Sequence, residues 1–303
     1  MDINALDGLL KLAEKAEQSG KFATVMGMAF PFVGLKKKAV EVYVKDIENS
    51  DLPPESKMMA IYNTKKTFKE LKNQAAIIEI AKNAAKDGTD FSNSSLVDED
   101  WLARYLDSAK FVSDEETQVL WGNVLAGEFE SPGSAPSSII RILSEMTRAD
   151  AEAFSALCSM RSLLLAFDKN VKLVFGKYAT IIPPNDLFTD ELRQELPYRS
   201  ISNLEFLGLI KYNPEYGFKT QFDRTTVSYV LIKYENSGFL CSNWPSPYFP
   251  IGTVEMSQAG EYLSKFVYRK TFKDYVPVLK TYLVSNRLSP VEVDPDNITV
   301  SFK

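Results

Sequence analysis

Apolar residues recur at intervals of three and four along the first 160 residues, and this spacing predicts a succession of amphipathic helices. Long helices are expected over residues 5–18, 36–47 and 55–86, with Pro, Gly, Asn and Ser residues between them. Shorter helices are expected between residues 98 and 160. Because the connections are short, we expect consecutive helices to be antiparallel neighbours in one bundle.

Local signals mark where these shorter helices begin and end. Asp98 is a candidate N-cap for the first of them. Ser113 and Glu116 have the S-x-x-E spacing of a capping box, which predicts the start of the next helix. Gly127 is expected to end that helix, and Thr147 to begin the last one.

The pattern changes after residue 161, where β-branched and aromatic residues become frequent. Residues 171–182 and 226–234 are predicted strands. A helix ending at Gly208 leads into a strand, and residues 251–256 form a strand that leads into another helix. This order of helix, strand, hairpin, strand and helix is typical of winged-helix domains. A further helix is expected near residues 270–284, and a terminal strand at residues 298–302.

These elements predict a mainly α protein with a smaller α+β part. We expect amphipathic helices and an apolar segment in residues 1–54, and a helical bundle in residues 55–160. Residues 161–303 are expected to form a winged-helix-like C-terminal domain. A chain of 303 residues with 45% apolar residues is long enough for more than one core.

The composition argues against catalysis. The chain has no histidine, which excludes imidazole acid–base chemistry, His-dependent nucleophiles and His-containing metal sites. The sequence has no phosphate-binding glycine motif, and its clustered glutamates lie where helix ends are predicted. Cys158 and Cys241 lack metal or redox spacing, so buried free thiols in a cytoplasmic protein are expected. We therefore predict a protein that is not an enzyme and has no cofactor, metal or small-molecule substrate.

The net charge of −5 is unevenly distributed. Residues 57–86 contain seven lysines and two glutamates, whereas residues 87–130 contain eleven acidic and two basic residues. Two interpretations are open: the blocks attract each other within the fold, which we favour, or they face different partners.

The uncharged segment at residues 22–35 lies between Lys21 and three lysines at residues 36–38. Fourteen residues are too few to cross a bilayer as a helix, and Pro31 would interrupt one. Burial or self-association is the favoured interpretation, and contact with a membrane surface is the alternative. We expect no secretory signal, because residues 1–18 are amphipathic and charged.

The stretch from residue 98 to residue 154 resembles the bacterial domain-of-unknown-function family 2806 and, more distantly, the Abi-alpha group of abortive-infection proteins. The elements that carry the resemblance are Asp100-Trp101, Val112-Ser113-Asp114-Glu115, Gln118, Leu120-Trp121, Leu125-Ala126-Gly127-Glu128, Pro132-Gly133-Ser134 and Asp150-Ala151 with Phe154. This chain has residues 135–138 where relatives tend to carry an arginine, so an anion site there is doubtful. The resemblance brings no established activity, but its association with phage defence implies a sensor, adaptor or effector.

Two surfaces are candidates for protein contact or self-association. The first is an interaction edge, which consists of Gly127, Glu128, Ser131, Pro132, Gly133 and Ser134. The second is an aromatic contact patch in a Pro-rich loop, which consists of Trp244, Tyr248 and Phe249. Packing of that loop onto its own domain is an equal alternative. We therefore predict a non-enzymatic interaction or assembly protein of bacterial phage defence or stress response.

DNA binding by the winged-helix-like part is the main alternative, and a membrane-acting effector using residues 21–38 is a lesser one. Candidate nucleic-acid contacts are Lys65, Lys66, Lys69 and Lys72 in the long helix, with Arg199 and Asn203 in the later one. The acidic balance of residues 186–265 favours a protein partner over DNA.

Overall fold

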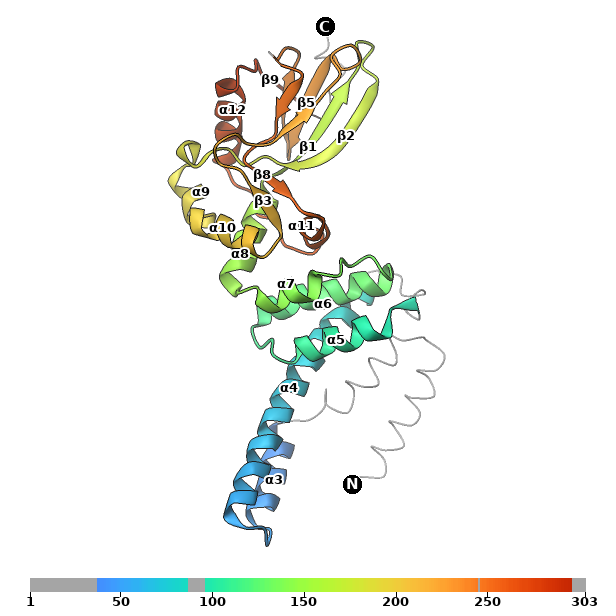
Figure 1. Cartoon of the computed structure of the whole chain (residues 1–303), viewed down its shortest axis with the longest axis vertical. Helices are drawn as coiled ribbons and strands as arrows, with labels where there is room; N and C mark the ends of the chain where they lie inside the picture. Colours follow the sequence, from blue (N-terminus) through green and yellow to red (C-terminus); the bar gives the residue numbers. More distant parts are fainter. Residues whose placement is uncertain (1–36, 87–95, 245, 296–303) are drawn as a thin grey trace. The chain divides into compact units, whose positions relative to one another are not determined.

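The computed structural model describes residues 37–86, 96–244 and 246–295 (Figure 1). About half of the chain is helical, and the fold is a mixture of α and β elements. The predicted helix at residues 5–18, most of the segment at residues 21–38 and the predicted strand at residues 298–302 lie outside the described residues.

The chain divides into two compact units, Met1–Glu145 and Met146–Lys303. We expected a boundary between residues 160 and 161. The helix at residues 148–159 instead packs against helices of the second unit. Its apolar side, which includes Phe154 and Leu157, is fully buried there.

The first unit is helical, as the spacing of apolar residues predicts. Its described helices are α3 (Lys37–Glu48), α4 (Pro54–Lys86), α5 (Glu99–Ala109), α6 (Glu115–Glu130) and α7 (Ile139–Glu145). The two most extended predictions, residues 36–47 and 55–86, are confirmed to within a residue or two by α3 and α4. The second half of α4 packs along α6, while α3 lies against its first half.

The contact between α4 and α6 is close because Gly122 has no side chain. A Cβ atom at Gly122 would lie 2.4 Å from Cγ2 of Ile80 and 3.1 Å from the carbonyl oxygen of Ile77. Two neighbouring side chains in this layer, Ile77 and Trp121, are fully buried. The helix pair is therefore packed at close to the limit that side-chain volume allows.

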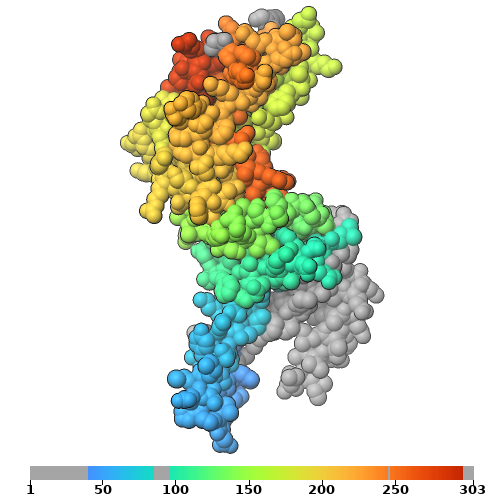
Figure 2. All heavy atoms as spheres, in the orientation of Figure 1, coloured from blue at the N-terminus to red at the C-terminus, as the bar shows by residue number. Residues whose placement is uncertain are grey.

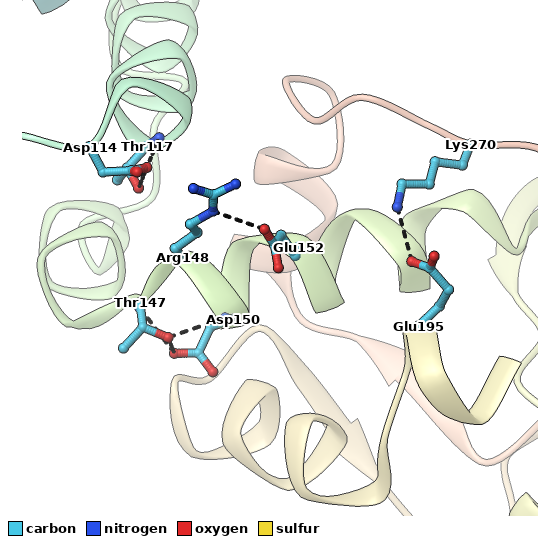
Figure 3. Close-up of polar contacts among 8 residues, drawn as sticks. All are labelled: Asp114, Thr117, Thr147, Arg148, Asp150, Glu152, Glu195 and Lys270. Atoms are coloured by element: carbon cyan, nitrogen blue, oxygen red, sulfur yellow. Dashed lines mark hydrogen bonds and ion pairs between the residues drawn. The ribbon is translucent and has the colours of Figure 1, made fainter. Parts of the chain in front are cut away.

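The helix starts in this unit are capped by aspartates. The Asp98 carboxylate accepts the Trp101 N–H at 2.7 Å, which confirms the predicted N-cap of α5. The predicted capping box at Ser113 is wrong, because α6 starts one residue later with Asp114 as its N-cap. The Asp114 carboxylate accepts both the backbone N–H and the hydroxyl of Thr117 at 2.8 Å (Figure 3). Gly127 does not end α6, which continues to Glu130.

The second unit combines helices with antiparallel sheets. Its helices are α8 (Arg148–Ser159), α9 (Asp190–Glu195), α10 (Tyr198–Phe206), α11 (Gln258–Leu263) and α12 (Tyr275–Ser285), with a 3-10 turn η2 (Asn185–Leu187). Its strands are β1 (Arg161–Phe167), β2 (Leu173–Thr180), β3 (Ile210–Tyr212), β4 (Lys219–Gln221), β5 (Tyr229–Tyr234), β6 (Ser237–Cys241), β7 (Tyr248–Pro250), β8 (Val254–Met256) and β9 (Val291–Val293).

Five of these strands form one antiparallel sheet in the order β2-β1-β5-β6-β9, and the pairs β3-β8 and β4-β7 form two small ladders. Strand β1 was not predicted from the sequence, although it lies inside the large sheet. Helix α8 begins with a capping box in which Thr147 and Asp150 bond reciprocally, so the predicted start at Thr147 is confirmed (Figure 3). Tyr275 lies in the core of this unit, and its hydroxyl contacts the carbonyl oxygens of Met160 and Ile181 at 3.0 and 2.8 Å.

A candidate interaction groove beside Glu128

The loop that follows α6 is held in place by one buried carboxylate. Glu128 is only 2% exposed, and its two oxygens accept the backbone N–H groups of Gly133 at 2.6 Å and Ala135 at 2.9 Å. Hydrogen bonds to a charged acceptor are stronger than neutral ones. Glu128 therefore fixes the loop on the last turn of its own helix.

The loop itself is a tight turn. The Ser134 N–H donates to the Ser131 carbonyl at 3.1 Å, and Gly133 has a φ of 78°. Proline at the second position and a left-handed glycine at the third are the residues that a type II turn prefers. The Ser131-Pro132-Gly133-Ser134 turn predicted from the sequence is confirmed.

A groove of about 1010 Å³ lies beside this turn, between α5 and α7. Its walls come from three places in the chain: α5 and its N-cap, the turn with Glu128, and α7 with the loop before it. The lining residues are Asp98, Trp101, Ala103, Arg104, Asp107, Ser108, Glu128, Gly133, Ala135, Ser137, Ile140, Arg141 and Ser144. The Glu128 bonds therefore shape one wall of a preformed groove.

The groove combines apolar walls with exposed charged rims. Trp101 and Ile140 supply apolar surface, and the Trp101 ring stacks on Tyr105 with 4.8 Å between ring centroids. On the rims, Arg141 pairs with Glu145 at 2.7 Å, while Arg104 is exposed on α5. Such an arrangement can bind an apolar side chain and a neighbouring carboxylate.

The predicted interaction edge coincides with this groove in part. Glu128 and Gly133 line it, and Ser131 and Ser134 are exposed in the adjoining turn. The sequence did not indicate Arg104, because it lies on another helix and no local pattern connects it to the turn. Its place follows from the packing of α5 beside α7.

The aromatic contact patch is not formed. Trp244 is 3% exposed and Phe249 is fully buried, and both rings pack against Phe222, with centroids 6.4 and 6.0 Å from it. Tyr248 is half exposed. The loop thus packs onto its own domain, which was the alternative interpretation of the same residues.

The candidate nucleic-acid residues belong to different units. Lys65, Lys66, Lys69 and Lys72 are exposed on α4 in the first unit, whereas Arg199 and Asn203 lie on α10 in the second. The Asn203 amide donates to Asp150 at 3.3 Å, so a structural contact uses it.

The opposed charge blocks meet through neutral groups. Where α4 approaches the end of α5, the amides of Asn73 and Gln74 donate to backbone carbonyls at 2.8 and 2.7 Å. The ion pairs described for the α4 lysines stay within that helix, as in Lys66–Glu70 at 3.9 Å. The favoured interpretation, attraction between the blocks, has no ion pair among the described contacts to support it.

Both cysteines are buried in the second unit. Burial raises the pKa of the Cys158 thiol to about 12, and that of Cys241 likewise to about 12. Among the residues that the structure describes, no three acidic or cysteine side chains gather as metal ligands. Within the same ranges, no helix is long and apolar enough to cross a membrane.

Comparison with known proteins gives one match. No curated protein and no solved structure is matched by this chain. Residues 62–280 match the family model described as "Protein of unknown function (DUF2806)". The match spans α4 through the main part of α12, including the groove and the large sheet except β9. Since it covers more than two thirds of the sequence, the chain belongs to the DUF2806 family of proteins of unknown function.

Proposed function

We propose that this protein is a non-enzymatic interaction protein that docks a segment of a partner protein in the groove between α5 and α7. The carrying observation is the buried Glu128 carboxylate, which accepts two backbone N–H groups and so preforms the groove wall. A preformed site does not have to be ordered when the partner binds, which lowers the entropic cost of association.

The lining residues define the chemistry of the partner segment. Trp101 and Ile140 favour an apolar side chain, and Arg104 favours an acidic residue next to it. The groove is at the upper end of the volume that small-molecule pockets occupy, and its rims are exposed side chains. Both properties suit a peptide segment better than a small ligand.

The biological setting is part of the proposal. The distant resemblance to abortive-infection proteins favours a cytoplasmic sensor, adaptor or effector in bacterial phage defence or stress response. The order α8, α9, α10, β3, β8 and α11 is compatible with a winged-helix-like module with insertions, and such modules also bind proteins.

DNA binding is the second candidate, because α4 exposes four lysines within residues 65–72. A mobility-shift assay on the full chain separates it from the first proposal. Salt-sensitive retardation of duplex DNA that Lys69→Glu weakens would favour DNA, whereas no retardation would remove this candidate.

Photocrosslinking in the native host tests groove docking. A photoreactive amino acid at Ser137, inside the groove, should give an adduct with a partner protein, and one at the exposed Asn170 in the second unit should not. Arg104→Glu should abolish the Ser137 adduct, while Lys169→Glu, a matched charge change at an exposed site, should leave it unchanged. An adduct that is indifferent to Arg104→Glu, or no adduct at all, would overturn the proposal.

A further inference from the structure

The first half of α4 exposes large apolar side chains close together. Met58 is 71% exposed, and Met59 and Tyr62 are each 62% exposed. None of the side chains of residues 54–72 is buried. Figure 2 shows the blue surface of α3 and this part of α4 without atoms of α5, α6 or α7 over it in that view. Three large apolar residues within about one helical turn form a contact surface rather than scattered exposure.

The exposed residues form a stripe with alternating spacings of three and four. It runs through Glu55, Met58, Tyr62, Lys65, Lys69 and Lys72. This spacing is that of the a and d positions of a coiled coil, so the stripe faces one direction and fits alongside another helix.

The charge along the stripe changes sign. Asp51 and Glu55 precede Tyr62, and Lys65, Lys69 and Lys72 follow it. A second copy that paired in parallel would place lysines against lysines. A second copy that paired antiparallel would place the acidic end of one helix against the basic end of the other.

The register follows from the spacing. Glu55 and Lys69 are each seven residues from Tyr62, which is about 10 Å along a helix at 1.5 Å per residue. With Tyr62 at the two-fold axis, Glu55 of each copy therefore faces Lys69 of the other, and the contact occurs twice by symmetry.

The same register brings the methionines over lysine stems. Met59 is three residues before Tyr62 and Lys65 is three after it, so the Met59 side chain meets the aliphatic part of Lys65 in the second copy. Lys66 similarly faces Met58 while it remains within reach of Glu70 on its own helix. Apolar contact and charge complementarity thus specify the same arrangement.

We propose that the protein forms a two-fold symmetric dimer through antiparallel pairing of α4 about Tyr62, with Glu55 of each copy against Lys69 of the other. The interface uses none of the groove residues and does not depend on the groove's proposed partner. Because each copy contributes only a few large apolar side chains, the dimer is concentration-dependent, with a Kd on the order of micromolar.

Sedimentation velocity of the full chain over a range of concentrations tests this dimer. The unmodified protein should pass from monomer to dimer as concentration rises. Glu55→Lys or Lys69→Glu alone should each weaken dimerisation at least tenfold, because each places like charges opposite one another twice. Circular dichroism verifies that these exposed substitutions leave the fold intact.

An equimolar mixture of the two variants is the decisive sample. In a mixed dimer the lysine introduced at position 55 of one copy faces the glutamate introduced at position 69 of the other. The second contact is the unmodified pair of Glu55 and Lys69, so dimerisation should return. Glu191→Lys, at an exposed position of the second unit, should leave dimerisation of the otherwise unmodified protein unchanged, as should Arg104→Glu in the groove. A monomer at every concentration, a dimer indifferent to both single variants, or a mixture that stays monomeric would each overturn the proposal.

Discussion

Replacement of Glu128 by glutamine tests whether this side chain holds the turn beside the groove. The change keeps the size and shape of the side chain but removes its charge and one of its two acceptors. In the protein, one carboxylate oxygen accepts Gly133 N–H at 2.6 Å and the other accepts Ala135 N–H at 2.9 Å. In the glutamine variant, one of these donors would face an amide NH₂ group, which cannot accept it.

The magnitude follows from those two bonds. One charge-assisted hydrogen bond is lost and the other becomes neutral, for a total of about 2 to 3 kcal/mol. The loop can open locally and its N–H groups can then reach water, since Gly133 is exposed. The cost therefore reduces the local opening free energy, and amide exchange should become about 30- to 150-fold faster at 1.36 kcal/mol per factor of ten.

Hydrogen–deuterium exchange of the full chain, resolved to peptides that cover residues 129–136, measures this effect. Glu130→Gln is the matched control, because Glu130 lies on the same last turn of α6 and is exposed. Its exchange should match that of the unmodified protein. If Glu128→Gln and Glu130→Gln exchange alike at Gly133 and Ala135, the carboxylate does not hold the turn and the reasoning is refuted.

Two further outcomes are expected in the two units. Gly122→Ala should lower the free energy of unfolding in urea by about 1 to 3 kcal/mol, because the new methyl group overlaps Ile80, at 2.4 Å in the present structure; a variant as stable as the unmodified protein would contradict this packing. With the pKa of Cys158 and Cys241 raised to about 12, the thiolate fraction at pH 8 is very small, so both thiols should resist a disulfide reagent in the native protein and react promptly in urea. Fast labelling without denaturant would contradict the burial of these side chains.

Local features of this fold could be predicted from the sequence. Asp98 and the Thr147–Asp150 pair determine where helices begin, because an N-cap acts on amides within the next turn. The Ser113 prediction was wrong by one residue, since Asp114 offers a charged acceptor to the same first turn.

Features that depend on contacts distant in sequence could not be predicted. Strand β1, with the sequence Arg161–Phe167, is a short apolar run that periodicity alone cannot distinguish from a buried helix. The burial of Trp244 depends on Phe222, which precedes it by some twenty residues and lies in a different segment. The groove likewise requires α5 to lie beside α7, which no residue pattern within either helix specifies.

The absence of a side chain at Gly122 also sets the axial position of α4 on α6. Ile80 occupies the space that a Cβ atom would need, and one turn away on α6 stand Gln118 and Ala126, which both have one. A slide of α4 by one turn, about 5.4 Å, would bring Ile80 against a side chain where it now meets bare backbone. Gly122 is thus a register key for the helix pair, and it fixes how far the Tyr62 end of α4 extends beyond α6.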